Sequence, residues 1–127
     1  MKTITIFVID NQPLFRRGLA SMLKLYPEFQ VLGDAPALRE GLIKILAQRP
    51  DVVMLGNHFD EDGRNAAAVI KQCCPSTRVI VFVDSYIPDP IVTVNPNADG
   101  YLSKKRITIT EITNSILRVA KKEGLAI

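Results

Sequence analysis

One stretch near the start of the chain decides the fold: Ile4-Thr5-Ile6-Phe7-Val8-Ile9-Asp10-Asn11-Gln12-Pro13. The residues up to Ile9 are apolar or β-branched, as expected for a short strand that is covered on both faces. Polar residues follow where this strand would end, and Pro13 stands where a helix can begin. The stretch therefore predicts the strand, loop and helix that open an α/β domain.

The same alternation of apolar runs and amphipathic stretches continues along the chain. Further strands are predicted at 29–32, 51–55, 78–83 and 101–102. The helices between them are expected to bury apolar residues at helical spacing. These residues are Leu14, Leu19, Met22 and Leu23 after Pro13; Leu38, Leu42, Ile45 and Leu46 after Pro36; Ala67, Val69 and Ile70; and Ile109, Ile112, Ile116, Leu117 and Val119. Strands that alternate with helices predict a parallel sheet with helices on both faces.

Residues 84–97 depart from this alternation. A fourth helix is expected there, yet the stretch contains Pro88, Pro90 and Pro96, with β-branched residues between them. Proline interrupts a helix, and β-branched side chains lower helix propensity. We therefore expect a short, irregular or missing helix at this place.

Length and composition exclude several classes of protein. The chain has 127 residues, of which 47% are hydrophobic and 23% charged, a balance typical of a single globular domain spanning residues 1–127. The adjacent Cys73 and Cys74 are interpreted as free thiols at a helix end. A net charge of +3 is too small to indicate nucleic-acid binding. Without a run of ~20 apolar residues or a signal peptide, we expect a cytoplasmic protein without a membrane partner.

Three stretches carry a resemblance to a known family: Val8 to Leu19, Arg49 to Leu55, and Ala98 to Lys104. In residues, order and approximate spacing they resemble the receiver domains of two-component response regulators, particularly the LuxR/NarL type. The resemblance implies a flavodoxin-like (CheY-like) doubly wound parallel sheet of five strands in the order 2-1-3-4-5. It also implies a role in signal transduction and transcription regulation, with no output domain within residues 1–127.

The resemblance also locates a phosphorylation site. A working receiver accepts a phosphoryl group on an aspartate after the third strand, beside a Mg²⁺ ion held by that aspartate and an acidic pair. By resemblance the acceptor position is Gly56, which has no side chain. The acidic pair falls on Asp10 and Asn11, so one carboxylate is replaced by an amide. A hydroxyl expected after the fourth strand falls on Val83.

Two positions keep the family's residue types, Lys104 and the switch aromatic Tyr101. Mg²⁺ prefers several oxygen ligands in octahedral geometry, so its binding at Asp10 alone is expected to be weak or absent, and no other metal or cofactor is expected. Phosphoryl transfer needs charge neutralisation and a nucleophile held in line. We therefore interpret the chain as a degenerate receiver, or pseudo-receiver, with no catalytic residues and no enzymatic activity, in which Tyr101 is a packing residue.

Some acidic residues near this site have two interpretations. Asp60 and Asp62 belong to a solvated acidic turn, or one of them replaces the missing acceptor. Asp84, after the fourth strand, is a third possible substitute acidic residue. Lys104 is expected to pair with Asp10 or Asp84, because a half-buried ammonium needs a partner.

Three functions follow from these observations. The first is a phosphorylation-independent module that binds a protein partner or a second copy of itself; the proline-rich stretch disturbs the family's usual contact face, and Phe15 and Arg16 on the first helix offer another. The second is a divergent phospho-acceptor that uses the acidic turn. The third is a small-ligand sensor that uses the pocket vacated by Gly56 and Val83. Lys105, Arg106, Arg118, Lys121 and Lys122 are interpreted as solvated surface, without direct nucleic-acid binding.

Overall fold

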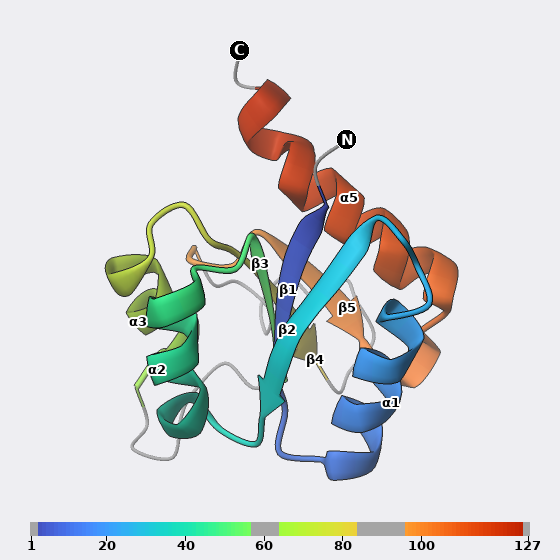
Figure 1. Ribbon diagram of the computed structural model, residues 1–127, viewed down its shortest axis with the longest axis horizontal. Helices are drawn as coiled ribbons and strands as arrows, with labels where there is room; N and C mark the ends of the chain where they lie inside the picture. Colours follow the sequence, from blue (N-terminus) through green and yellow to red (C-terminus); the bar gives the residue numbers. More distant parts are fainter. Residues whose placement is uncertain (1–2, 57–63, 84–95, 126–127) are drawn as a thin grey trace.

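The computed structural model describes residues 3–56, 64–83 and 96–125. Within these residues, five parallel strands form one sheet in the order β2-β1-β3-β4-β5. The elements are β1 (Ile4–Ile9), α1 (Pro13–Leu23), β2 (Phe29–Ala35), α2 (Leu38–Gln48), β3 (Val52–Leu55), α3 (Ala66–Cys73), β4 (Arg78–Val83), β5 (Gly100–Ser103), the 3-10 helix η1 (Lys104–Arg106) and α5 (Ile109–Leu125) (Figure 1). The predicted flavodoxin-like sheet and its strand order are confirmed. The predicted irregularity of a fourth helix falls on residues 84–95, outside the described residues.

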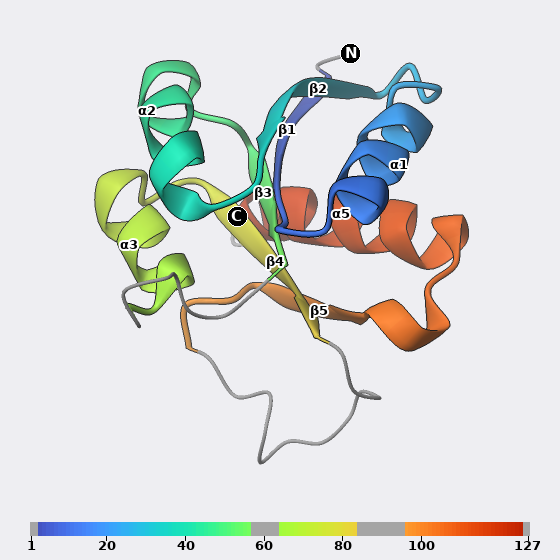
Figure 2. The same ribbon diagram turned by 90° about the horizontal axis from the view of Figure 1, so that it is seen from below.

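The sheet is the middle of three layers. Helices α1 and α5 cover one face and α2 and α3 cover the other (Figure 2). Because successive side chains of a strand point to opposite faces, β1 serves both layers. Phe7 and Ile9 join the core cluster under α2 and α3, whereas Ile6 and Val8 join the cluster under α1 and α5. The nearly continuous apolar run of β1 is therefore explained by burial on both sides.

The structure corrects the predicted inner faces of α1 and α2. Leu14 is 91% exposed and Leu46 is 41% exposed, although both were predicted to be buried. Leu14 precedes the buried Leu19 by five residues, or about 1.4 helical turns, so it points away from the sheet. Leu46 directly follows the buried Ile45 and is turned by about a quarter of a circle from it. Helix α2 also begins at Leu38, after Ala37 as its N-cap, and not at Pro36.

Two glycines make room for the ring of Phe7 in the core. A Cβ atom built on Gly33 of β2 would lie 3.1 Å from Phe7 Cε2, and one on Gly41 of α2 would lie 3.0 Å from Phe7 Cε1. At Gly41 the added atom would also lie 3.3 Å from both Ala35 Cβ and Ile9 Cδ1. Helix α2 can therefore approach the sheet closely because residue 41 has no side chain.

We predict opposite effects for two glycine-to-alanine substitutions in helices. Gly41→Ala should lower the free energy of unfolding by about 1–2 kcal/mol, because three core side chains must move to admit the methyl group. Gly18→Ala on α1 should raise it by about 0.5–1 kcal/mol, because its Cβ meets nothing within 4 Å and alanine favours the helix. Denaturant unfolding of both variants checks this, and equal stabilisation by both would contradict the close packing at residue 41.

Candidate functional site

The candidate site lies where the central strands end. The backbone N–H of Gly56, after β3, donates to the carbonyl of Ile9 at 2.8 Å, and the N–H of Asp10, after β1, donates to the carbonyl of Ala35 at 3.1 Å. These two bonds continue the pairing of β1 with β3 and β2 one step beyond the strands. Asp10 and Gly56 are thereby held side by side at the carboxyl edge of the sheet, where open parallel sheets place their functional groups.

The carboxylate of Asp10 fills the space beside Gly56. A Cβ atom built on Gly56 would lie 2.2 Å from Asp10 Oδ2 and 2.6 Å from its Cγ, far closer than atoms that are not bonded can approach. Asp10 itself is only 2% exposed. The space that a side chain of residue 56 would take is therefore filled by the Asp10 carboxylate. The wider ligand pocket predicted around Gly56 and Val83 borders residues outside the described part of the chain and stays a prediction.

Lys104 supplies the counter-charge for this buried carboxylate. Its Nζ lies 2.7 Å from Asp10 Oδ2 and donates to Gln12 Oε1 at 2.6 Å. The ammonium also lies 4.4 Å from the centre of the Phe15 ring, a cation–π contact. The predicted pairing of Lys104 with Asp10 is confirmed, while the other candidate partner, Asp84, lies outside the described residues.

The second oxygen of Asp10 is held by the backbone of its own turn. The N–H of Gln12 donates to Asp10 Oδ1 at 2.8 Å. In the described part of the chain Oδ2 accepts no hydrogen bond of good geometry, so the ammonium of Lys104 is its counter-charge. A buried carboxylate is costly without such compensation. The Asp10 carboxylate is therefore stabilised by a hydrogen bond from its own turn and by the positive charge of Lys104 in η1.

A buried arginine that the sequence analysis assigned to a docking surface belongs to this site. Arg16 is 8% exposed; its Nε lies 2.7 Å from Asp34 Oδ2, and its Nη1 donates to the backbone carbonyl of Asp10 at 2.8 Å. Arg16 therefore links α1 and β2 to the turn after β1. The docking surface proposed from Arg16 and Phe15 is wrong: Phe15 is half-buried and packs edge-on against Phe82, with ring centroids 5.0 Å apart.

The remaining residues of the predicted site are spread along the same edge. Asn11 is exposed, whereas Val83 is buried at the end of β4. Tyr101 of β5 is partly buried and packs against the core cluster under α2 and α3, consistent with a packing residue. The acidic residues considered as substitutes, Asp60 and Asp62, lie outside the described residues.

The described residues fit a Mg²⁺ ion poorly. No group of three His, Cys, Asp or Glu side chains comes together among them as a metal site. Beside Gly56, both oxygens of Asp10 are already engaged, Oδ1 by the Gln12 N–H and Oδ2 by Lys104. A divalent cation at Asp10 would have to displace the ammonium and would find no second carboxylate among these contacts. Weak or absent Mg²⁺ binding stays a prediction.

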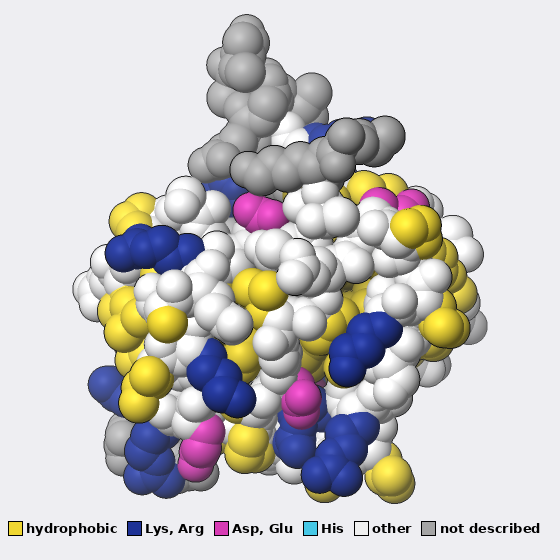
Figure 3. All heavy atoms as spheres, viewed as in Figure 1, with side chains coloured by type: hydrophobic (Ala, Val, Ile, Leu, Met, Phe, Trp, Pro, Cys, Tyr) yellow, Lys and Arg dark blue, Asp and Glu magenta, His cyan; other side chains and the backbone are white. Residues whose placement is uncertain are grey.

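The surface carries its positive charge in separate places. Lys105, Arg118 and Lys121 are exposed, and on the face seen in Figure 3 the lysine and arginine side chains lie in scattered groups. None of the described helices is both long and apolar enough to cross a membrane.

The fold is the CheY-like receiver fold, and similarity to known proteins supports this class. No model of a known protein family matches the sequence. Among solved structures, the signal receiver domain of NarL from Mycobacterium tuberculosis is 29% identical, with a TM-score of 0.80 over 96% of this chain and 99% of that chain. The response regulator domain of CheB from Thermotoga maritima has the same fold, with a TM-score of 0.77 at 21% identity.

The curated relatives include nitrate/nitrite response regulators. The nitrate/nitrite response regulator protein NarL of Escherichia coli is 28% identical over 102 residues, which cover 79% of this chain and 47% of the relative. A homologous nitrate/nitrite response regulator of Haemophilus influenzae is 29% identical over 122 residues, covering 94% and 58%. The chain spans about half the length of the curated relatives it matches. The chain is therefore similar over most of its length to response regulators, and it has the receiver fold.

The contact between Asp10 and Gly56 predicts a strong coupling between these positions. Gly56→Ala should lower the free energy of unfolding by about 2–4 kcal/mol, because the methyl group displaces the Asp10 carboxylate from Lys104. The same substitution should cost much less in an Asp10→Ala background, where the carboxylate is absent. A double-mutant cycle by denaturant unfolding measures this coupling; additive effects would show that the carboxylate does not occupy that space.

The two adjacent arginines of α1 should differ sharply in their contribution to stability. Arg16→Met should lower the free energy of unfolding by about 2–3 kcal/mol, because the Asp10 carbonyl and the Asp34 carboxylate lose their donor. Arg17→Met removes the same charge from an exposed position and should change stability by less than about 0.5 kcal/mol. Thermal unfolding of the pair checks the prediction, which fails if the two variants behave alike.

Proposed function

We propose that the chain is a receiver-type regulatory domain that acts through protein contacts, without phosphorylation of an aspartate at the end of β3. The observation that carries this proposal is the carboxylate of Asp10, whose Oδ2 stands 2.2 Å from the position of a Cβ atom at Gly56. A side chain at residue 56 and the present orientation of Asp10 are mutually exclusive. The acceptor position therefore lacks a side chain, and the Asp10 carboxylate occupies the space that this side chain would need.

The state of Lys104 supports the same function. By resemblance, this lysine faces the phosphoryl group in a working receiver. Here the Lys104 side chain is only 13% exposed, and its ammonium is already paired with Asp10 at 2.7 Å. Val83 adds no hydroxyl at the end of β4. The contact that a phosphoryl group would make with the lysine is thus replaced by an internal carboxylate, which fixes η1 against the turn after β1.

We propose a protein partner or a second copy of the chain as the target of this domain. The similar chains include a protein named as the DNA-binding transcriptional activator DevR/DosR of Mycobacterium tuberculosis, and the present chain matches 48% of its length. On this basis we propose a place in the N-terminal part of a LuxR-type transcription regulator, where DNA contacts would be made outside this domain. A cytoplasmic location, without a membrane partner, remains part of the same proposal.

Phosphorylation chemistry gives the direct test. After incubation with acetyl phosphate and Mg²⁺, the intact mass should show no phosphoryl adduct under conditions that label an ordinary receiver. Asp60→Asn and Asp62→Asn variants are measured alongside. An adduct on the wild-type chain that disappears in one of these variants would overturn the proposal and establish a relocated acceptor.

Asp10 needs its own control, because among the described residues its carboxylate occupies the space beside the acceptor position. An adduct that persists in both loop variants and disappears in Asp10→Asn would also overturn the proposal, by making Asp10 the acceptor. Because Asp10→Asn breaks the ion pair with Lys104, its circular dichroism spectrum is compared with that of the wild type before labelling. A folded variant and no adduct in any chain support phosphorylation independence.

A further inference from the structure

A cavity lies at the opposite edge of the sheet from Asp10. Its volume is about 290 Å³, and its lining includes Thr3, Asp51, Ser76, Arg78 and Lys121. These residues come from the points where β1, β3 and β4 begin and from the last turns of α5. The cavity is thus formed by elements distant in sequence, and it shares no residue with the candidate site.

The carboxylate in the cavity wall already serves the fold. Asp51 Oδ2 accepts hydrogen bonds from the N–H of Thr5 at 2.9 Å and from its hydroxyl at 3.1 Å. The Thr5 hydroxyl oxygen in turn accepts a bond from the N–H of Asp51 at 2.9 Å. These bonds join the beginning of β1 to the residue before β3. One oxygen of Asp51 is therefore committed to a structural role beside two cationic side chains, Arg78 and Lys121.

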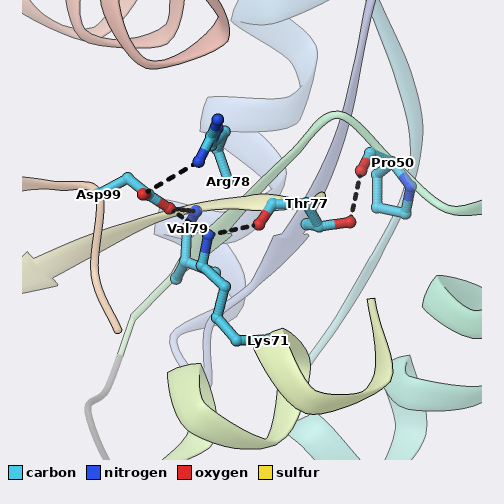
Figure 4. Close-up of polar contacts among 6 residues, drawn as sticks. All are labelled: Pro50, Lys71, Thr77, Arg78, Val79 and Asp99. Atoms are coloured by element: carbon cyan, nitrogen blue, oxygen red, sulfur yellow. Dashed lines mark hydrogen bonds and ion pairs between the residues drawn. The ribbon is translucent and has the colours of Figure 1, made fainter. Parts of the chain in front are cut away.

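The next carboxylate, Asp99, is shared between two cations. Its side chain is only 11% exposed; Oδ2 lies 2.7 Å from Lys71 Nζ and accepts a bond from the N–H of Val79 at 2.8 Å. Its Oδ1 lies 3.7 Å from Arg78 Nη1, so the lysine is held more closely than the arginine (Figure 4). Lys71, Arg78 and Lys121 carry three positive charges, against two negative charges on Asp51 and Asp99. Among the side chains that the structure describes, these five, of which Asp51, Arg78 and Lys121 line the cavity, have a net charge of +1.

We propose that this cavity binds a small oxyanion, either inorganic phosphate or the phosphate or carboxylate group of a metabolite. Arg78, whose Nη1 also lies 3.7 Å from Asp99 Oδ1, contributes a planar guanidinium, which suits the oxygens of phosphate and carboxylate. Lys121 adds a second positive charge, and the hydroxyls of Ser76 and Thr3 add neutral donors. A volume of about 290 Å³ is at the small end of ligand sites. The site takes a compact anion rather than a large cofactor.

The path of α5 is compatible with an anion at this position. The end of a helix that exposes unsatisfied carbonyl groups repels anions, but only its last four carbonyls lack helical partners. Helix α5 continues to Leu125, so Ala120 and Lys121, which line the cavity, precede these last carbonyls. The carbonyls without helical partners begin one residue after Lys121, so the Lys121 ammonium must outweigh the negative end of the helix dipole at the cavity.

An NMR titration of the full chain tests this site. Inorganic phosphate is added at constant ionic strength, with acetate as the second probe and chloride as the screening control. Saturable shifts are expected for the amides of Ser76, Arg78 and Lys121 with phosphate. Saturation by acetate as well assigns the site to oxyanions in general, and saturation by phosphate alone assigns it to phosphate compounds. Saturation by neither probe overturns the proposal.

A matched pair of variants on α5 separates a built site from general attraction to a basic surface. Lys121→Gln should weaken phosphate binding about tenfold, because one charge-assisted hydrogen bond is lost. Arg118→Gln removes an equal charge from an exposed position of the same helix, outside the cavity lining, and should leave the affinity unchanged. Equal weakening in both variants would overturn the proposal, since the phosphate would then be an adventitious ion only. Neither substitution removes a buried contact, so both chains should fold.

Discussion

The ion pair between Lys104 and Asp10 is the interaction on which the carboxyl edge of the sheet depends. Asp10 is 2% exposed, and a carboxylate buried to this degree is costly unless a counter-charge stands beside it. Lys104 follows β5, which is separated from β1 by β3 and β4 in the sheet. Its side chain therefore reaches Asp10 across the ends of these two strands. One contact of 2.7 Å therefore ties the turn after β1 to the 3-10 helix after β5. Phe15 and Gln12 surround the same ammonium and limit its positions.

The turn that carries Asp10 is held from two directions. Lys104 binds its side chain, and Arg16 donates to its backbone carbonyl at 2.8 Å. Arg16 is also paired with Asp34 at 2.7 Å, so the end of β2 takes part in the same arrangement. Two cations thus fix one short turn, each with its own carboxylate partner. Because both contacts are largely buried, water competes with them less than it does at an exposed ion pair.

The sequence predicted the fold well because its strands are buried on both faces and stand out as apolar, β-branched runs. It was less informative about orientation within helices, where Leu14 and Leu46 were assigned to the buried face and Arg16 to the surface. The helical periodicity of α1 already indicated that Arg16 is buried, since Arg16 precedes Leu19 by three residues and shares its face. The position of the Asp10 carboxylate had no such signal. A missing side chain at Gly56 suggests empty space, and only the three-dimensional arrangement shows that a neighbour fills it.

Gly56 and the orientation of Asp10 are best understood as one structural feature. With a side chain at residue 56, the Asp10 carboxylate could not stand where it does, and its present contact with Lys104 would be lost. With Gly56, the carboxylate turns inward and the lysine remains in a fixed position without a phosphoryl group. The receiver fold is thus compatible with a site in which Lys104 neutralises the Asp10 carboxylate. The same fold can therefore exist without the phosphoryl transfer for which receivers are known. Under the proposed function, a signal acts on this domain either by breaking the Lys104–Asp10 pair or through a surface remote from it.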